Sequence, residues 1–481
     1  MADRLRAGAP AIASTTAALL LAGCSFAPAY APPQVEVASA FKETGPMTPP
    51  APADAALRGD WWRVYGDQTL DGLEAQAAQA NNSLASAVAR YDQSRALLAQ
   101  AGAALVPEVD AVGAVQANRQ SKNRPLRLPA GTGPNNYDNN QLGAAVNYEL
   151  DLWGRIRNTI AASRDQAQAS AADLRGVELS LQAELANDYM ALRGADAQLR
   201  LLNGTVDAYS RAYDLTRTRH EGGAASGLDE DRAETQLRTA RALIPDLKAQ
   251  RALYEHAIAV LVGKPASVFS IPATDAAPSP PKTPVTAASS LLQRRADVAA
   301  AERRAAAANA QIGVAKAAYF PTLTLGLSAG FQDAGGVNLL QAPNSYWTLG
   351  PQMVAPLFDG GRRKAQTRFA EAQFAQAAAD YKQTVLGAFQ NVEDQLALNN
   401  QLADEADETA LAVAAAVKTQ DLALTRYRLG AADYLEVVTA QTAALVIQQS
   451  ALQVQTRRLQ ASVNLVRALG GGWTTAQLPK L

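Results

Sequence analysis

Two long windows of the chain contain no proline and carry a hydrophobic period of three to four residues. The windows span residues 135–244 and 357–478. Proline inside a helix costs about 3 kcal/mol, so its absence permits long helices. The apolar stripe of the first window consists of Leu174, Val177, Leu181, Leu185, Leu192, Ala195, Leu199, Leu202 and Val206. The stripe of the second consists of Val385, Phe389, Val392, Leu396, Ala403, Ala406, Ala410, Val413 and Val417. This spacing is typical of coiled-coil helices.

The pattern predicts two very long helices, at residues 154–220 and 361–429. At 1.5 Å per residue each is roughly 100 Å long, which no compact domain accommodates. A glycine-containing turn follows each long helix, and a second helix then returns to about residue 262 or residue 469. We therefore predict an elongated bundle or tube that is built from two long helix pairs.

Four shorter stretches alternate apolar residues with polar or small ones, which is the period of a β-strand. They lie at residues 106–116, 142–152, 322–331 and 347–357, and the first alternates least cleanly. We expect them to pair as two hairpins, at about residues 104–152 and 319–359. The fold class predicted is therefore mainly α, with long coiled-coil helices and four β-strands in each protomer.

The alternation allows two interpretations of these strands. One is a soluble sandwich sheet with one dry face, and the other is a transmembrane barrel with lipid outside and water inside. Four strands cannot close a barrel, because small barrels need about eight, and an open sheet edge is not tolerated in lipid. A membrane sheet of this kind must therefore oligomerise. Two copies supply 8 strands and three supply 12, and a lumen wide enough for solute favours the 12-stranded barrel of a trimer.

The two halves of the chain share one register, offset by 207 residues. Gly154 matches Gly361, and Gly263 matches Gly470. Such an internal repeat indicates duplicated architecture with related roles for equivalent elements. The predicted division is a first repeat at 57–263 with its helix pair at 154–262, a proline-rich linker at 264–284, a second repeat at 285–472 with its helix pair at 361–470, and a tail at 473–481.

Composition excludes several classes of function. The formal net charge is −1 and no stretch is strongly basic, so nucleic-acid binding is not expected. The two histidines, His220 and His256, have no metal-ligand spacing, and no phosphate-binding glycine loop precedes a helix. We therefore expect no catalytic residue, no metal and no cofactor other than a covalent lipid, and we predict that the protein is not an enzyme.

The N-terminus combines a basic start with a short apolar run, which is typical of a secretory signal peptide. This segment, residues 1–23, ends in Leu21-Ala22-Gly23 directly before Cys24, the single cysteine of the chain. The four residues resemble a bacterial lipobox, which implies cleavage and acylation at Cys24. The alternative is an ordinary signal peptide with an incidental cysteine. Residues 24–56 would then form an acylated, proline-rich tether. In lipoproteins of this type Ser25, rather than an aspartate, favours the outer membrane.

Several motifs in one order resemble those of the TolC-like outer-membrane efflux proteins, lipoprotein branch, across about residues 54–472. They are Asp60-Trp61-Trp62 with Tyr65-Gly66-Asp67, Leu150-Asp151-Leu152-Trp153-Gly154-Arg155, Leu291-Leu292-Gln293-Arg294-Arg295, Ala318-Tyr319-Phe320-Pro321 and Leu357-Phe358-Asp359-Gly360-Gly361-Arg362. The resemblance implies a homotrimer with a 12-stranded barrel in the outer membrane of a Gram-negative bacterium and a helical tube in the periplasm. It also implies two protein partners, a periplasmic adaptor (membrane fusion protein) and an inner-membrane RND-type pump.

The resemblance also assigns roles to the tips of the helix pairs. Asp229 and Glu436 correspond to acidic positions near a periplasmic gate, to which Leu435 and Thr439 also belong. The adaptor-docking residues would be Gly222, Gly223, Arg428, Leu429 and Gly430. An alternative is that the carboxylates only stabilise helix N-termini and that the glycines only cap helices. Relatives have aspartate and arginine where this chain has Thr439 and Thr442, which leaves open what holds this gate shut.

The function that these features imply is a passive exit duct of a tripartite efflux pump, which conducts small molecules such as drugs or metals. Within the duct class, the alternative is the outer-membrane channel of a type I protein secretion system. A structural periplasmic coiled-coil lipoprotein or an adaptor is a further alternative, which the four alternating strands disfavour.

Overall fold

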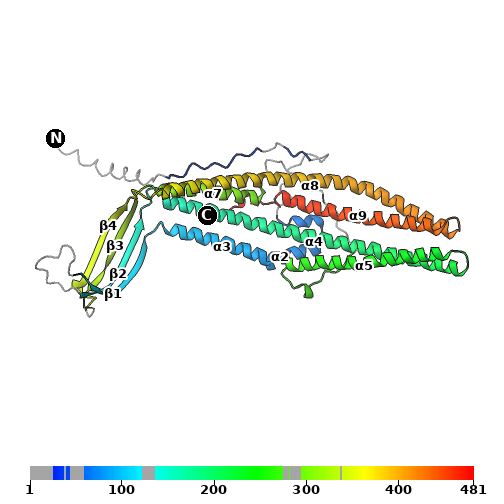
Figure 1. The fold of residues 1–481 in the computed structure, drawn as a ribbon, viewed down its shortest axis with the longest axis horizontal. Coiled ribbons are helices and arrows are strands. Elements are labelled where there is room, and N and C mark those ends of the chain that lie inside the picture. Colours follow the sequence, from blue (N-terminus) through cyan, green and yellow to red (C-terminus); the bar gives the residue numbers. More distant parts are fainter. Residues whose placement is uncertain are drawn as a thin grey trace, which may run out of the picture.

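The computed structural model describes residues 25–36, 40–43, 59–121, 136–274, 281, 294–335 and 338–481. The predicted signal peptide and Cys24 lie outside these residues, as do parts of the predicted tether and linker. The molecule is elongated, with a β-sheet at one end, a layer of helices behind it and two helical hairpin tips at the other end (Figure 1).

Two pairs of long helices form the body of the molecule. Helix α4 (Arg155–Glu221) and helix α8 (Arg362–Arg428) each contain 67 residues. Helix α5 (Gly227–Leu261) returns along α4, and helix α9 (Tyr434–Ala468) returns along α8, each over 35 residues. These bounds confirm the long helices that the proline-free windows predict.

Shorter helices continue the return helices toward the sheet. Helices α2 (Gln68–Ala80) and α3 (Asn82–Ala103) belong to the first half, and α7 (Ala296–Ala317) to the second. Near the sheet the helices lie in the order α3–α4–α7–α8, and toward the tips in the order α5–α4–α9–α8. The end of α5 therefore meets the start of α3, and the end of α9 meets the start of α7.

The two helix joints use equivalent glycines. Gly263 has φ +70° and Gly470 has φ +91°, a conformation that L side chains rarely adopt. A Cβ on Gly263 would overlap the carbonyl of Ala80, and one on Gly470 would overlap the carbonyl of Arg294. The repeat thus conserves both the backbone geometry and the close approach at each joint.

Short segments cover one side of the helix layer. We call η1 (Trp61–Tyr65), α2 and residues 264–274 the belt; the last of these includes η2 (Ala266–Val268). Its core buries Trp61, Leu70, Tyr189, Met190 and Ile258 among the helices. Residues 25–36 and 40–43 run beside α7 and α8, where Phe41 packs on Val298 and Val385. The tail contains η5 (Thr475–Gln477).

The sheet consists of four antiparallel strands in the order β1-β2-β3-β4. They are β1 (Glu108–Arg119), β2 (Asn136–Glu149), β3 (Thr322–Asp333) and β4 (Ser345–Val354), with η4 (Ala342–Asn344) before β4. Both predicted hairpins are present, and β2 pairs with β3 to join them.

The strand bounds differ from the prediction by two to six residues at most ends, and the pairing explains two of these differences. β2 begins six residues before the alternating stretch, because its polar first residues pair with the end of β1. β4 ends at Val354, before the predicted residue 357, because Val354 pairs with Thr322, the residue at which its partner β3 begins.

Candidate functional site

One face of the sheet is apolar across all four strands. The register places Val109 opposite Val146, Val146 opposite Leu327, and Leu327 opposite Leu349. Paired residues point to the same face, so these four side chains form one continuous apolar row. The neighbouring row contains Ala111, Ala144, Ala329 and Trp347.

The other face is polar or small. Glu149 lies opposite Thr324, which lies opposite Gln352. A second row on this face contains Asp110, Ala145, Ser328 and Thr348. The sheet therefore separates an apolar side from a water-compatible side, as the alternation predicts.

The apolar face of the sheet is bare. Val115 is 87% exposed and Trp347 is 74% exposed, and within the described residues no helix packs on this face. A soluble sandwich would bury such side chains. β1 and β4 each pair with one strand only, which leaves two sheet edges open. Because lipid does not tolerate open edges, further copies must complete the sheet. None of the helices in the described ranges is both long and apolar enough to cross a membrane.

The predicted gate carboxylates occupy equivalent positions at the tips of the two hairpins. Asp229 is in the first turn of α5, where its backbone amide donates the capping hydrogen bond to Ser226 Oγ at 3.2 Å and its carboxylate lies 3.5 Å from Arg232. Glu436 is in the first turn of α9, which Asp433 caps. Both carboxylates therefore serve the helix N-termini, as the alternative interpretation proposed, and this local role does not test the gate role.

Glu436 has a partner that the sequence analysis missed. Arg426 at the end of α8 reaches across the turn, and its Nη1 lies 2.6 Å from Glu436 Oε1. Thr439 donates to the carbonyl of Leu435 at 2.8 Å, and Thr442 accepts from Gln236 of α5 at 3.5 Å. The tip thus has an ion pair inside one protomer, between Arg426 and Glu436, which Thr439 and Thr442 do not join.

The predicted adaptor-docking residues lie at the two turns. Gly223 has φ +72° and Gly430 has φ +75°. Each turn is closed by a backbone hydrogen bond to the last helical turn: the amide of Ala224 donates to the carbonyl of Arg219, and the amide of Ala431 donates to that of Arg426. Gly222 has an ordinary φ of −84°. Beside the second turn lie Arg428, which ends α8, and Leu429, which is 79% exposed. These residues are accessible, and their role in docking stays a prediction.

The two hairpin tips contact each other within the protomer. Arg219 of α4 donates to the carbonyl of Tyr427 at 2.6 Å, and its guanidinium lies 4.8 Å from the centre of the Tyr427 ring. Tyr427 donates to Thr216 at 3.4 Å and meets the Tyr434 ring edge-on. Burial raises the pKa of Tyr434 and keeps it neutral. Arg219 lies 207 residues before Arg426 and is its equivalent in the internal repeat, so the repeat could have indicated Arg219 as a second tip arginine with a contact.

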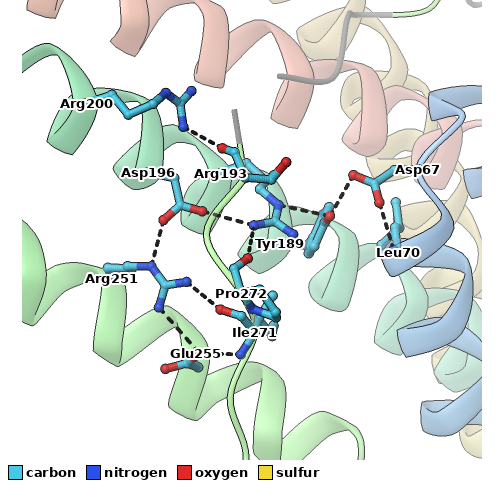
Figure 2. Close-up of polar contacts among 11 residues, drawn as sticks. Asp67, Leu70, Tyr189, Arg193, Asp196, Arg200, Arg251, Glu255, Ile271 and Pro272 are labelled. Carbon is cyan, nitrogen blue, oxygen red and sulfur yellow. Dashed lines mark hydrogen bonds and ion pairs between the residues drawn. The ribbon is translucent and has the colours of Figure 1, made fainter. Parts of the chain in front are cut away.

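A buried ionic network joins the belt to the first helix pair (Figure 2). Asp196, with a 1% exposed side chain, accepts from Arg193 Nη1 at 3.0 Å and from Arg251 Nε at 2.7 Å. Arg193 also donates to the Tyr189 hydroxyl at 2.9 Å, which donates to Asp67 at 2.6 Å. Burial and the bond to Asp67 raise the pKa of Tyr189 to about 12.

The same arginines hold the segment that leaves the first repeat. Arg193 donates to the carbonyl of Pro272 at 2.8 Å, and Arg251 donates to that of Ile271 at 2.6 Å. Figure 2 shows both arginines pointing, one from α4 and one from α5, toward this extended segment of the belt. The second repeat has Asn400 and Ala403 at the positions of Arg193 and Asp196, so the network exists in the first helix pair only.

A helix layer that ends in an open sheet with one bare apolar face is the protomer of an oligomeric outer-membrane channel. The family model described as outer membrane efflux protein matches residues 73–264 and 287–471. The chain therefore belongs to the outer membrane efflux protein family, whose members are channel-type proteins and not enzymes.

Similar proteins support the same assignment. Outer membrane protein OprJ of Pseudomonas aeruginosa is 32% identical over 479 residues, which cover 98% of this chain and 97% of OprJ. The toluene efflux pump outer membrane protein TtgC of Pseudomonas putida is 31% identical and covers 95% of this chain, with 94% of TtgC aligned. The solved channel OprN has a TM-score of 0.87 at 28% identity, covering 94% of this chain and all 100% of its own.

These findings confirm the family, the fold class, the efflux function and the outer-membrane location that the sequence predicts. A second solved neighbour, CusC, has a TM-score of 0.82 at 25% identity, with 93% of this chain and 100% of that chain covered. The neighbours are TolC-like channels in which the four-stranded sheets of three chains form one barrel.

Proposed function

We propose that three copies of this chain form the passive exit duct of a tripartite efflux pump. The observation that carries the proposal is the continuous apolar face of the sheet with its two open edges. Three sheets closed edge to edge give one barrel with lipid outside and the polar rows of residues inside. The helix layers of the three copies continue this barrel as a tube, and no catalytic step is needed for conduction.

The duct requires partners that supply energy and sealing. We propose a periplasmic adaptor, the membrane fusion protein, at the exposed tip residues, and an RND-type pump in the inner membrane. Relatives are named for toluene efflux and for pyoverdine export, so we propose small organic solutes as cargo. These names favour a pump over type I protein secretion.

The gate of this duct is proposed to lie at the tips, where Asp229, Leu435, Glu436 and Thr439 of three copies would meet. Six carboxylates close to one pore would attract cations. The matching first-turn positions of Asp229 and Glu436 support this arrangement, since the trimer axis would relate them in rings.

The proposed function is tested by single-channel conductance in planar bilayers. The purified wild-type protein is compared with the double variant Asp229→Ala, Glu436→Ala. A cation-selective conductance that rises or loses selectivity in the variant supports both the duct and the gate. If the wild type and the variant both form membrane-inserted trimers and neither conducts, the gate must lie in other residues or require the adaptor to open. Absence of both trimers and conductance would reject the channel and favour a spacer lipoprotein.

We further propose that Cys24 carries a lipid. Residues that follow it are held at the junction of sheet and helices, where Ser25 donates to Asn158 at 3.0 Å and Phe26 stacks on Phe320 at 4.4 Å. An acyl chain attached to Cys24 would thus enter the membrane beside the sheet. A relative of 28% identity carries the name "Probable outer membrane lipoprotein SilC". Palmitate labelling of the wild type and its absence in Cys24→Ser would test this, with mass spectrometry of the mature N-terminus.

A further inference from the structure

The side of the helix layer opposite the belt contains a hollow of about 690 Å³. Residues from α3, α4, α7, α8 and α9 line it. Because α3 and α8 are the two outermost helices of the layer, a hollow that both of them line lies on the side toward which the layer curves. In the proposed duct this is the wall of the lumen.

The faces of α4 support this placement. At 100° per residue, the hollow-lining Asp173 and Val177 point roughly 120–160° away from Tyr189 and Arg193, which face the belt. A second hollow, of about 420 Å³, spans α3, α4, α7 and α8 nearer the sheet and uses the same face of α4. The two hollows therefore lie in line along the concave side of the tube.

The two hollows differ in charge. The one near the sheet contains one arginine, one aspartate and the amides of Gln166, Gln311, Gln373 and Gln376. The one beside the belt, which we call the equatorial hollow, contains three arginines and two aspartates. Its excess of positive charge is therefore a local feature of the wall and not a property of the whole lumen.

Within the part of the chain that the structure describes, two of the three arginines have no counter-ion. Arg295 is paired with Asp297 at 2.6 Å, and Asp173 is paired with Arg304. Arg90 on α3 and Arg467 on α9 are exposed, and within the described residues no hydrogen bond or ion pair engages either of them. Three arginines and two aspartates give the lining a formal charge of +1, and the two arginines without a counter-ion lie on two helices that face a common space.

The floor between the arginines is apolar. Leu174, Val177 and Leu181 of α4 share the hollow with the amides of Asn391, Gln395 and Asn464. A guanidinium binds carboxylate, sulfonate or phosphate oxygens in a bidentate manner, and the volume lies in the range of small-molecule sites. Two acids, Glu184 and Asp188, follow on α4 beyond the hollow, and neither lines it.

We propose that the equatorial hollow is a binding site for small organic anions with an apolar body and two or more acidic groups. It retains such solutes on the lumen wall through Arg90 and Arg467 on their way to the barrel. The binding site rests on the geometry of the hollow, whereas its place on the export path rests on the proposed duct.

The test measures binding of pyranine, a pyrene that carries three sulfonates, to the purified full-length protein in a neutral detergent. Fluorescence anisotropy is expected to show saturable binding that weakens as salt is raised. Arg90→Gln with Arg467→Gln is expected to weaken binding by about tenfold or more, and Arg90→Lys with Arg467→Lys by about threefold or less. The matched control, Arg238→Gln with Arg457→Gln, removes the same charge from exposed sites outside the hollow and leaves binding unchanged.

Two outcomes would overturn the site. One is wild-type protein that conducts in bilayers but shows no saturable pyranine binding, which rejects the anion site and leaves the duct intact. The other is equal binding by the glutamine variant and the wild type. Pyranine binding with the expected variant pattern in protein that neither forms trimers nor conducts would keep the site and reject the duct.

Discussion

Glu74 is an acid that the fold buries without a partner. It is 1% exposed, and within the described residues neither carboxylate oxygen has a hydrogen bond. Burial first, and the nearby Asp71 second, raise the pKa of Glu74 from 4.5 to about 9. At neutral pH the folded protein therefore holds a proton on Glu74 that the unfolded chain releases.

The sign of the pH dependence follows from this proton. Between pH 4.5 and about 9 the folded state binds more protons than the unfolded state, so the free energy of unfolding falls as pH rises, by up to about 1.4 kcal/mol per pH unit. Glu74→Gln removes this dependence. We expect the variant to gain stability over the wild type as pH increases from 5 to 8, measured by thermal unfolding. Parallel curves for both proteins would contradict the prediction, and exposed Glu408→Gln serves as the control.

Asn81 stabilises two helix ends with one side chain. Its Oδ1 accepts from the amide of Leu84 at 3.0 Å as the N-cap of α3, and its Nδ2 donates to the carbonyl of Leu261 at 2.9 Å at the end of α5. Asn81→Ala is expected to lower the free energy of unfolding by about 1–3 kcal/mol. Asn82→Ala, the same change at an exposed neighbouring position, is expected to cost much less. Chemical denaturation of both variants measures the difference, and equal losses would show that the joint does not depend on Asn81.

The buried ionic network around Asp196 predicts that residues 269–274 are held in place by the two arginines that donate to their carbonyls. Asp196→Asn leaves Arg193 and Arg251 buried with one partner fewer, which is expected to cost about 3–5 kcal/mol. Residues 269–274 would then exchange their amide hydrogens faster, because the arginines that bind their carbonyls lose their orientation. Hydrogen exchange is compared with Asp246→Asn, an exposed site on α5. Unchanged exchange in this segment would show that the carbonyl contacts alone hold it.

Local sequence patterns predicted the helices and strands of this fold. They did not predict contacts between residues that are far apart in the sequence. Proline-free windows and hydrophobic periods predicted α4, α5, α8 and α9 within a few residues, because helix formation depends on neighbouring positions. The alternation predicted which strand residues share a face. It did not predict the network of Asp67, Arg193 and Arg251, since those residues are 58 or more positions apart and polar side chains alone do not name their partners.

At the tips of the molecule, contacts between the two helical hairpins fix the position of one hairpin relative to the other. A prediction about the gate follows from these contacts. Arg219 joins α4 to α8 through the carbonyl and the ring of Tyr427, whereas Arg217, on the same helix, pairs only with Glu221 of its own hairpin within the described residues. In a trimer, the position of each second hairpin relative to the first determines how far the three tips extend toward the axis. Loss of a cross-hairpin contact should therefore allow them to separate.

We expect Arg219→Ala to raise the single-channel conductance of the purified protein, and Arg217→Ala to leave it at the wild-type value. Arg219→Lys retains the charge but lacks the planar group that stacks on Tyr427, so it should give an intermediate conductance. If Arg219→Ala assembled as a stable trimer with unchanged conductance, the contact would be structural only. The gate would then depend on the Arg426–Glu436 pair, and Arg426→Ala, which breaks that pair, would be the variant that opens the duct.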